Sequence, residues 1–277
     1  SKKKKIDFSM ILFNNQDIMT SPSELTKPSE INYDNLTFSE KNTLPIGASF
    51  VNVQYNGNPL YLQFPKLTAF GINKQYNEDE STEQKKFEST VRFEKMDEDS
   101  KVKECYEGLR TFEKHVKKWA KENSLDLFKK KKMSDEVIDT IFNDFFKARK
   151  DKDTGEESET EFYLRFKYPL DTKSNDGTFN VGVFNSKNKS MELTIDNIRS
   201  TILQYSTVKV VLTPNIYISS GKFGVTWKVW QLKYWEPERQ NAILDKKTYC
   251  MVDSSDDEEE EESDVPEEEN KNEDDDD

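Results

Sequence analysis

The segment GKFGVTWKVWQLKYW, residues 221–235, carries three of the four tryptophans of this 277-residue chain, interleaved with lysines. Alternate side chains of a β-strand point to opposite faces. One face of such a strand holds a mostly apolar row typical of a core: Phe223, Val225, Trp227, Val229 and Gln231. The other face holds Thr226, Lys228, Trp230, Leu232 and Tyr234, with Lys233 and Trp235 at its end. The segment therefore predicts a strand with one core face and one face that mixes aromatic and basic side chains.

Two interpretations of this mixed face are open. Aromatic rings beside lysines suit a single-stranded nucleic acid, because rings stack on any base and lysines follow the phosphates. The alternative is that Trp230 and Tyr234 pack beneath helices while the lysine stems lie along the surface. The alternation alone favours neither interpretation.

Two further segments show the same mixture, which favours the nucleic-acid interpretation. In FYLRFKY, residues 162–168, Tyr163, Arg165 and Lys167 lie opposite an apolar face. In YLQFPK, residues 61–66, Tyr61 lies near Lys66. A single strand face with aromatic and basic side chains is common on the surface of a β domain, whereas three such faces in one domain are not.

The periodicity of the chain predicts strands on both sides of a helical pair. Alternating segments predict strands at 46–55, 60–64, 67–70, 87–93, 162–168, 179–184, 191–194, 208–213 and 216–219. Between them, one apolar stripe at helical spacing predicts a first helix: Val102, Cys105, Leu109, Phe112, Val116 and Trp119. Ser134 is a good N-cap for a second helix, residues 147–161 read as a mobile loop, and a short helix is expected at 196–204. We expect a mainly β (α+β) barrel or sandwich with a helical insertion at about 97–150.

The charge of the chain divides into two unlike parts. Residues 253–277 contain seventeen acids and one lysine, a net charge of −16, which leaves +3 for residues 1–252 out of the total of −13. Such a run cannot bury apolar area, so a disordered acidic tail is predicted. Ahead of it we expect an irregular N-terminal arm at 1–44, a β domain at 45–235 and a linker at 236–252.

Few residues are available for catalysis or metal binding. His115 is the only histidine, and it lies among lysines on the first helix, where a solvated surface position is expected. Cys105 falls on the apolar stripe, and with Cys250 it makes neither a disulfide framework nor a zinc site. The glycines of GKFG are explained by a turn. We therefore expect no enzyme, no cofactor and no metal, and an intracellular, reducing location.

No apolar run approaches the ~18–20 residues that a membrane span needs, so no membrane partner is expected.

Two motifs resemble the single-stranded-DNA-binding proteins of nucleocytoplasmic large DNA viruses. PLYLQFPKLTAFGI, residues 59–72, resembles their early-strand signature, and YISSGKFGVTWKVWQLKY, residues 217–234, resembles their closing-strand signature. That family is similar in turn to a bacteriophage replication type, an OB-fold with an acidic C-terminus. The resemblance covers about residue 46 to the end, with 97–161 poorly anchored. This chain has no aromatic residue after Tyr249, whereas the phage type ends its tail with one.

The resemblance implies a non-enzymatic, OB-fold-like protein that coats single strands in viral DNA replication, recombination or repair, in the host cytoplasm or nucleus. Its stacking and basic positions match best at Trp227, Lys228, Trp230 and Lys233. The tail is then expected to compete for the DNA groove and to contact a polymerase or helicase, and a homodimer is compatible with this role. The candidate DNA-binding residues are Trp227, Lys228, Trp230, Lys233, Tyr234, Tyr163, Arg165, Lys167, Tyr61 and Lys66.

Two alternatives remain open at this point. The chain could be an acidic-tailed chaperone or assembly protein that binds basic partners, or a minor structural protein of a virion.

Overall fold

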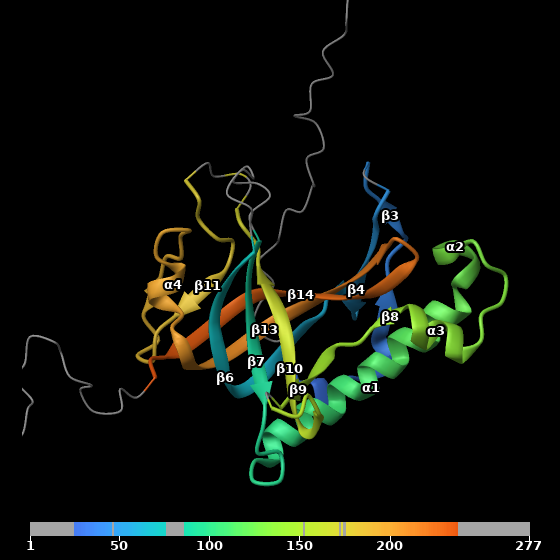
Figure 1. Ribbon diagram of the computed structural model, residues 1–277. Coiled ribbons are helices and arrows are strands. Elements are labelled where there is room, and N and C mark those ends of the chain that lie inside the picture. Colours follow the sequence, from blue (N-terminus) through green and yellow to red (C-terminus); the bar gives the residue numbers. More distant parts are fainter. Residues whose placement is uncertain are drawn as a thin grey trace, which may run out of the picture. The chain divides into compact units, whose positions relative to one another are not determined.

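The computed structural model describes residues 25–237, apart from 46, 76–85, 152, 172 and 174–175 (Figure 1). Its centre is a barrel of five long strands: β6 (Tyr61–Gln75), β7 (Lys86–Phe93), β10 (Glu157–Tyr168), β13 (Gln204–Ser219) and β14 (Lys222–Trp235). They pair in the order β6-β7-β10-β14-β13, and β13 pairs with β6 to close the ring. The neighbours are antiparallel except β10 and β14, which are parallel. The predicted OB-fold-like barrel is confirmed, since a five-stranded barrel of this kind is the OB architecture.

The barrel interior is filled by alternate residues of all five strands. Its fully buried side chains include Leu62, Phe64, Val91, Phe93, Leu164, Phe166, Val208 and Leu232. Each alternates with a more exposed neighbour, because successive strand side chains point to opposite faces. The strands predicted at 60–64 and 67–70 are one strand, β6, whose pairing with β13 shifts between Lys209 and Val211.

A bulge in β14 corrects the predicted faces of the segment at 221–235. Leu212 pairs with Val229 and Val211 with Gln231, so Trp230 is the extra residue. A bulge of one residue reverses the alternation that follows it. Leu232 and Tyr234 are therefore buried, and the prediction that they share the face of Lys228 and Trp230 is wrong. Gln231, Lys233 and Trp235 take the outward positions instead.

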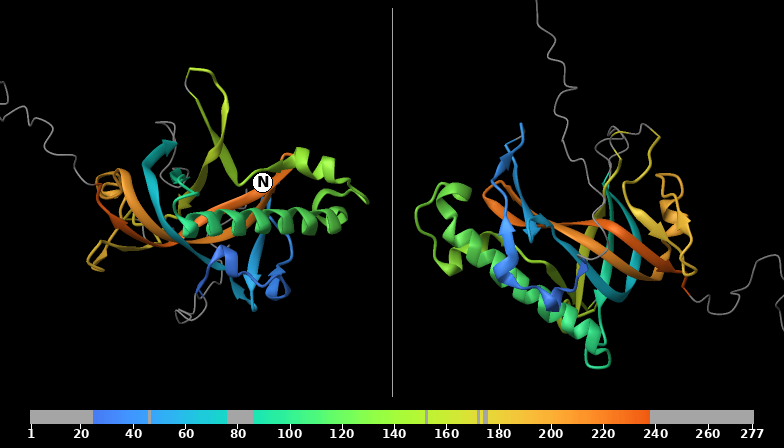
Figure 2. Two further views of the ribbon diagram at one scale, coloured as in Figure 1. Left: turned by 90° about the horizontal axis from the view of Figure 1, so that it is seen from below. Right: turned by 180° about the vertical axis from the view of Figure 1, so that it is seen from behind.

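The long helix α1 (Ser100–Glu122) covers one side of the β13–β14 hairpin (Figure 2). It begins at Asp99, whose side chain accepts hydrogen bonds from two backbone N–H groups of the first turn. The predicted stripe is buried as far as Val116, and the ring of Phe112 packs on that of Trp227 with centroids 6.0 Å apart. Trp119 is only half-buried and stacks on Phe38 at 4.2 Å.

Three shorter helices are present in the part of the chain that the structure describes: α2 (Ser124–Phe128), α3 (Asp135–Ile141) and, after the barrel strand β10, α4 (Ile198–Thr201). Of these, α2 and α3 lie beside α1, and α4 lies near β11 (Gly182–Phe184) (Figure 1). The hydroxyl of Ser134 accepts a hydrogen bond from the backbone of Val137, so the predicted N-cap is present. Helix α4 is shorter than the expected helix at 196–204.

The region after α3 is more ordered than predicted. It forms β8 (Phe142–Asn143) and β9 (Phe146–Lys150), and β9 pairs with β10 in a hairpin that projects from the barrel (Figure 2). The prediction of a mobile loop at 147–161 is therefore wrong. Beyond β10, β11 (Gly182–Phe184) pairs parallel with β14, and β12 (Ser190–Met191) pairs with β11.

The described part of the N-terminal arm lies against α1 and the sheet. It contains β1 (Leu25–Thr26), the 3-10 turns η3 (Pro28–Glu30) and η4 (Tyr33–Asn35), β2 (Leu36–Phe38) and β3 (Asn42–Thr43), followed by β4 (Ser49–Tyr55) and β5 (Asn58–Pro59). A Cβ on Gly108 of α1 would lie 2.4 Å from the Pro28 carbonyl carbon, so only glycine allows this approach.

The arm also packs on His115. Its ring lies 4.7 Å from that of Tyr33 and 6.1 Å from that of Phe38, centroid to centroid. The expectation that His115 is a solvated surface residue is therefore wrong. Burial lowers the pKa of His115, and the neighbouring Lys118 lowers it further.

The compact unit that holds the described residues ends at Pro237. The predicted linker beyond 237 and the predicted acidic tail lie outside the described residues. Among the helices that the structure describes, none is long and apolar enough to cross a membrane.

Candidate nucleic-acid interface

Three lysines lie side by side on the outer face of the barrel. Lys209 of β13 is the register partner of Lys66 on β6 and of Lys233 on β14. We call these three residues the lysine row. No carboxylate among the described residues forms an ion pair with any of them. Like charges directly opposite on neighbouring strands are destabilising. The lysine row therefore lowers the stability of the protein without a ligand, and a bound anion would relieve the repulsion.

An aromatic ring lies at the edge of the lysine row. Trp235 is outward on β14, and the ammonium groups of Lys66 and Lys233 lie 4.3 and 5.0 Å from its ring centroid. A cation over an indole face is attracted to the ring, which holds the ammonium groups near the aromatic surface. The ring therefore places charge and stacking area at one position.

A second aromatic pair lies on the other side of the row. The rings of Trp230 and Tyr61 are 4.8 Å apart and tilted, and Trp230 is 39% exposed. A large apolar side chain so exposed is available to contact a planar ligand. Both residues were predicted for the interface, and the barrel brings them together from strands far apart in sequence.

Beyond Trp235 lies a third group of rings. Phe70 of β6 contacts Tyr205 and Tyr163 edge-on, at 5.5 and 5.6 Å. The guanidinium of Arg92 lies 4.6 Å from the Phe70 ring centroid and also pairs with Glu94 at 2.7 Å. Of these, only Tyr163 was predicted.

These groups form one path along the strands. From Lys228 to Trp235 the chain advances seven residues, about 23 Å at the usual strand rise. In register order the path passes Trp230 with Tyr61, then the lysine row, then Trp235, then the Phe70 rings. Alternating rings and cations over such a length suit a stretch of several nucleotides.

The predicted basic residues of β10 are partly neutralised. Glu88 of β7 is 4% exposed, and its carboxylate pairs with Arg165 at 3.3 Å and Lys167 at 3.8 Å. Lys228 is the register partner of Lys167. Desolvation lowers the pKa of Lys228, and the Lys167 charge lowers it further, although the residue is exposed as a whole. This side of the barrel is therefore a weaker anion site than the lysine row.

Two predicted site residues are corrected by their burial. Trp227 is 2% exposed and lies among core rings, 5.2 Å from Phe145 and 6.3 Å from Phe64. Tyr234 is 6% exposed, and its hydroxyl donates to Met191 Sδ at 2.9 Å. Neither ring has a face that a base could reach, so neither belongs to the interface.

The sequence interpretation missed Lys209, Arg92, Phe70 and Tyr205. Lys209 lies between valines in VKVVLT, a polar position in an apolar strand, and that alternation was the signal for an outward lysine. The remaining three follow only from the pairing of β6, β7 and β13.

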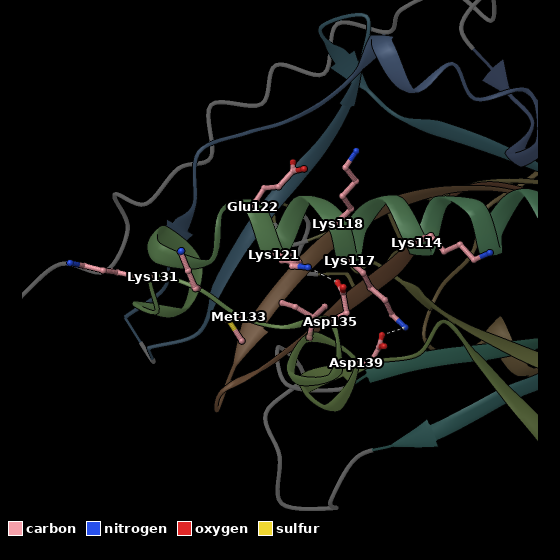
Figure 3. A pocket seen from close by; sticks show the side chains of 11 residues that line it. Lys114, Lys117, Lys118, Lys121, Glu122, Lys131, Met133, Asp135 and Asp139 are labelled. Atoms are coloured by element: carbon pink, nitrogen blue, oxygen red, sulfur yellow. Dashed lines mark hydrogen bonds and ion pairs between the residues drawn. The ribbon is translucent and has the colours of Figure 1, made fainter.

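Away from the barrel face, a basic hollow with a volume of about 650 Å³ lies between α1 and α3 (Figure 3). Two of the six lysines that line it are paired: Lys117 contacts Asp139 at 3.1 Å, and Lys121 contacts Asp135 at 2.9 Å. Figure 3 shows both pairs between the two helices. The two pairs join α1 to α3. The carboxylates of Glu122, Asp135 and Asp139 also line this hollow, which makes it less suited to a polyanion than the lysine row.

In the part of the chain that the structure describes, no cluster of three His, Cys, Asp or Glu residues could hold a metal ion.

No protein-family model and no curated protein matches this sequence. Among solved structures, the fold is similar to the single-stranded DNA-binding protein of bacteriophage Enc34 in complex with ssDNA. The identity is 10% and the TM-score 0.39, covering 74% of this chain and 94% of that one. It is also similar to gp2.5, a single-stranded DNA-binding protein of bacteriophage T7, at 16% identity and a TM-score of 0.41, covering 72% and 97%. Both TM-scores are below 0.5.

Proposed function

We propose that this protein binds single-stranded DNA with little sequence preference through the outer face of β6, β13 and β14. The observation that carries the proposal is the lysine row, three register partners without carboxylate partners among the described residues. Phosphates of a bound strand relieve the repulsion within the row. The flanking rings of Trp230, Tyr61 and Trp235 supply stacking, worth about 1–3 kcal/mol per base and indifferent to sequence.

A single strand fits this face better than a duplex. Stacking on Trp230 or Trp235 needs a base whose flat face is accessible, and bases inside a duplex are already stacked on one another. Ring stacking beside a basic groove is the mode by which proteins bind single strands without reading sequence. The role proposed is non-enzymatic: the coating of single strands during viral DNA replication, recombination or repair, in the host cytoplasm or nucleus.

The acidic segment at 253–277 is proposed to compete with DNA for the same face. It carries a net charge of −16, against +3 for the rest of the chain. A tethered segment reaches an effective concentration on the order of millimolar near its own domain. Once DNA displaces it, the segment is free to bind basic surfaces of a polymerase or helicase.

The test is a titration of labelled oligo(dT) by fluorescence anisotropy, with the full chain and with a chain that ends at Val252, at two salt concentrations. We expect both chains to bind and the shorter chain to bind more tightly. The difference should shrink with salt, because the Debye length falls from about 30 Å at 0.01 M to about 3 Å at 1 M.

Each outcome bears on one part of the proposal. If neither chain binds oligo(dT) at low salt, the DNA-binding proposal is wrong, and a chaperone that uses its acidic segment, or a virion structural protein, becomes the better candidate. If both bind with equal affinity at the lower salt, only the competition by the acidic segment is refuted.

A further inference from the structure

A hollow of about 320 Å³ lies within the proposed DNA-binding face, next to the lysine row. Its floor is Val211 of β13, which is 5% exposed. Gln63 of β6 and Gln231 of β14 are the register partners of Val211 and line the hollow on either side. Lys209 and Lys233 of the lysine row form its next edge, two residues or about 7 Å further along the strands.

The two glutamines have unused hydrogen-bonding groups. Both side chains are half-buried, and neither amide forms a hydrogen bond with any residue that the structure describes. Each amide offers two N–H donors and one carbonyl acceptor. Neither amide is among the buried unpaired side-chain groups of the described residues, so both reach the water of the hollow and can exchange it for a polar ligand. The matching edge of a nucleobase offers donors and acceptors in one plane.

The outer wall of the hollow is held in place by its own contacts. Phe184 of β11 is the register partner of Lys233, and Gly182 pairs with Gln231. A Cβ on Gly182 would lie 3.5 Å from both the Gln231 side chain and the Phe184 ring, which is an ordinary contact, so the three residues lie side by side at this wall.

A turn at 185–189 fixes the remaining wall residue. The side chain of Asn185 accepts hydrogen bonds from the backbone N–H groups of Lys187 and Lys189, both at 3.0 Å. Asn188 in this turn has a positive φ of 61°, and its side-chain carbonyl accepts a hydrogen bond from Lys233. The wall therefore positions one end of the lysine row as well as the hollow.

We propose that this hollow holds one base of the bound strand with its hydrogen-bonding edge against Gln63 and Gln231. The inference rests on the proposed function. The base lies over Val211 beside the Phe184 ring, and its neighbouring phosphates lie on Lys209 and Lys233. The volume is at the small end of ligand sites, about 300–1,000 Å³, which suits one base and excludes a base pair. The hollow gives one position of an otherwise indifferent site a dependence on the base.

The experiment compares two kinds of strand of equal length, oligo(dT) and a strand of abasic deoxyribose phosphates, with the full chain. The variant Q63M/Q231M keeps side-chain length and removes the amides. Its matched control is Gln54→Met, on β4 and outside the hollow. We expect Q63M/Q231M to bind oligo(dT) about 5- to 150-fold more weakly, the range of one good bidentate amide–base contact. Its affinity for the abasic strand should be unchanged, and Q54M should match the wild type on both.

The contrast between the strands separates the outcomes. An equal loss on both strands would show that the amides contact the backbone or that the face is distorted, and it would overturn the inference. An unchanged affinity for oligo(dT) would overturn it too, while leaving DNA binding intact. If the wild type binds neither strand, the proposed function itself fails and the inference falls with it. A urea midpoint for each variant shows whether the fold is kept.

Discussion

The lysine row leads to a prediction in which stability and affinity change in opposite directions. Lys209 has a lysine as its register partner on each side, and Lys209→Gln removes both like-charge pairs while keeping a long polar side chain. The free protein should become more stable because the repulsion is gone. The complex with single strands should become weaker because one phosphate contact is lost.

The expected change in stability follows from the two like-charge pairs that Lys209 makes, with Lys66 and with Lys233. Cross-strand pairs contribute roughly 0.2–1 kcal/mol each, so the free energy of unfolding should rise by about 0.4–2 kcal/mol at low salt. For single strands, the plot of log affinity against log salt has a slope of about −0.7 per phosphate contact. Its magnitude should therefore fall by about 0.7 for K209Q, and by about 2 when Lys66 and Lys233 are also replaced.

The stability is measured by urea denaturation at about 0.01 M and 1 M salt, where the Debye lengths are about 30 and 3 Å. The gain for K209Q should be present at the lower salt and absent at the higher. The matched control is Lys222→Gln, an exposed lysine of β14 that faces Ser219. A K209Q protein that is less stable than wild type at low salt, or whose DNA affinity keeps the full salt slope, would refute the reasoning.

Three further predictions concern single positions. Trp230→Ala should weaken oligo(dT) binding by about 1–3 kcal/mol. An unchanged affinity together with a lower melting temperature would mean that the ring only packs on Tyr61. Gly108→Ala should lower the melting temperature, since overpacking against Pro28 costs about 1–3 kcal/mol and helix propensity returns only about 1; a more stable variant would contradict this contact. Burial raises the pKa of Tyr33 from 10.0 to about 12, so the unfolded phenol ionises first and stability is lost as the pH rises from 10 to 12. Tyr33→Phe should flatten that loss in unfolding curves, and an unchanged curve would show that other groups cause it.

The barrel was predictable because apolar and polar residues alternate within each of its strands, and this pattern can be read from the sequence alone. The strands at 60–64, 87–93 and 162–168 each place apolar side chains on one face, and these faces are buried. The helical stripe of α1 is equally local. The hairpin of β9 was missed because residues 147–161 are polar throughout, and its pairing with β10 comes from backbone hydrogen bonds.

The interface was less predictable because it depends on register between distant strands. Lys66 and Lys209 are far apart in the chain, and only the pairing of β6 with β13 makes them neighbours. The bulge at Trp230 also depends on pairing between strands, because it is defined by the register of β14 against β13. Local alternation placed Tyr234 beside Trp230 on one face, whereas one extra residue turns Tyr234 into the core and Lys233 outward.

The four tryptophans occupy two kinds of environment, and this has a consequence for spectroscopy. Trp227 is enclosed by phenylalanine rings and Trp119 stacks on Phe38, whereas Trp230 and Trp235 lie on the proposed DNA-binding face. Under the proposed function, a bound strand quenches the emission of the two outward indoles and leaves that of the other two. The emission that survives at saturation should shift to the blue, because buried Trp227 then makes up more of the signal.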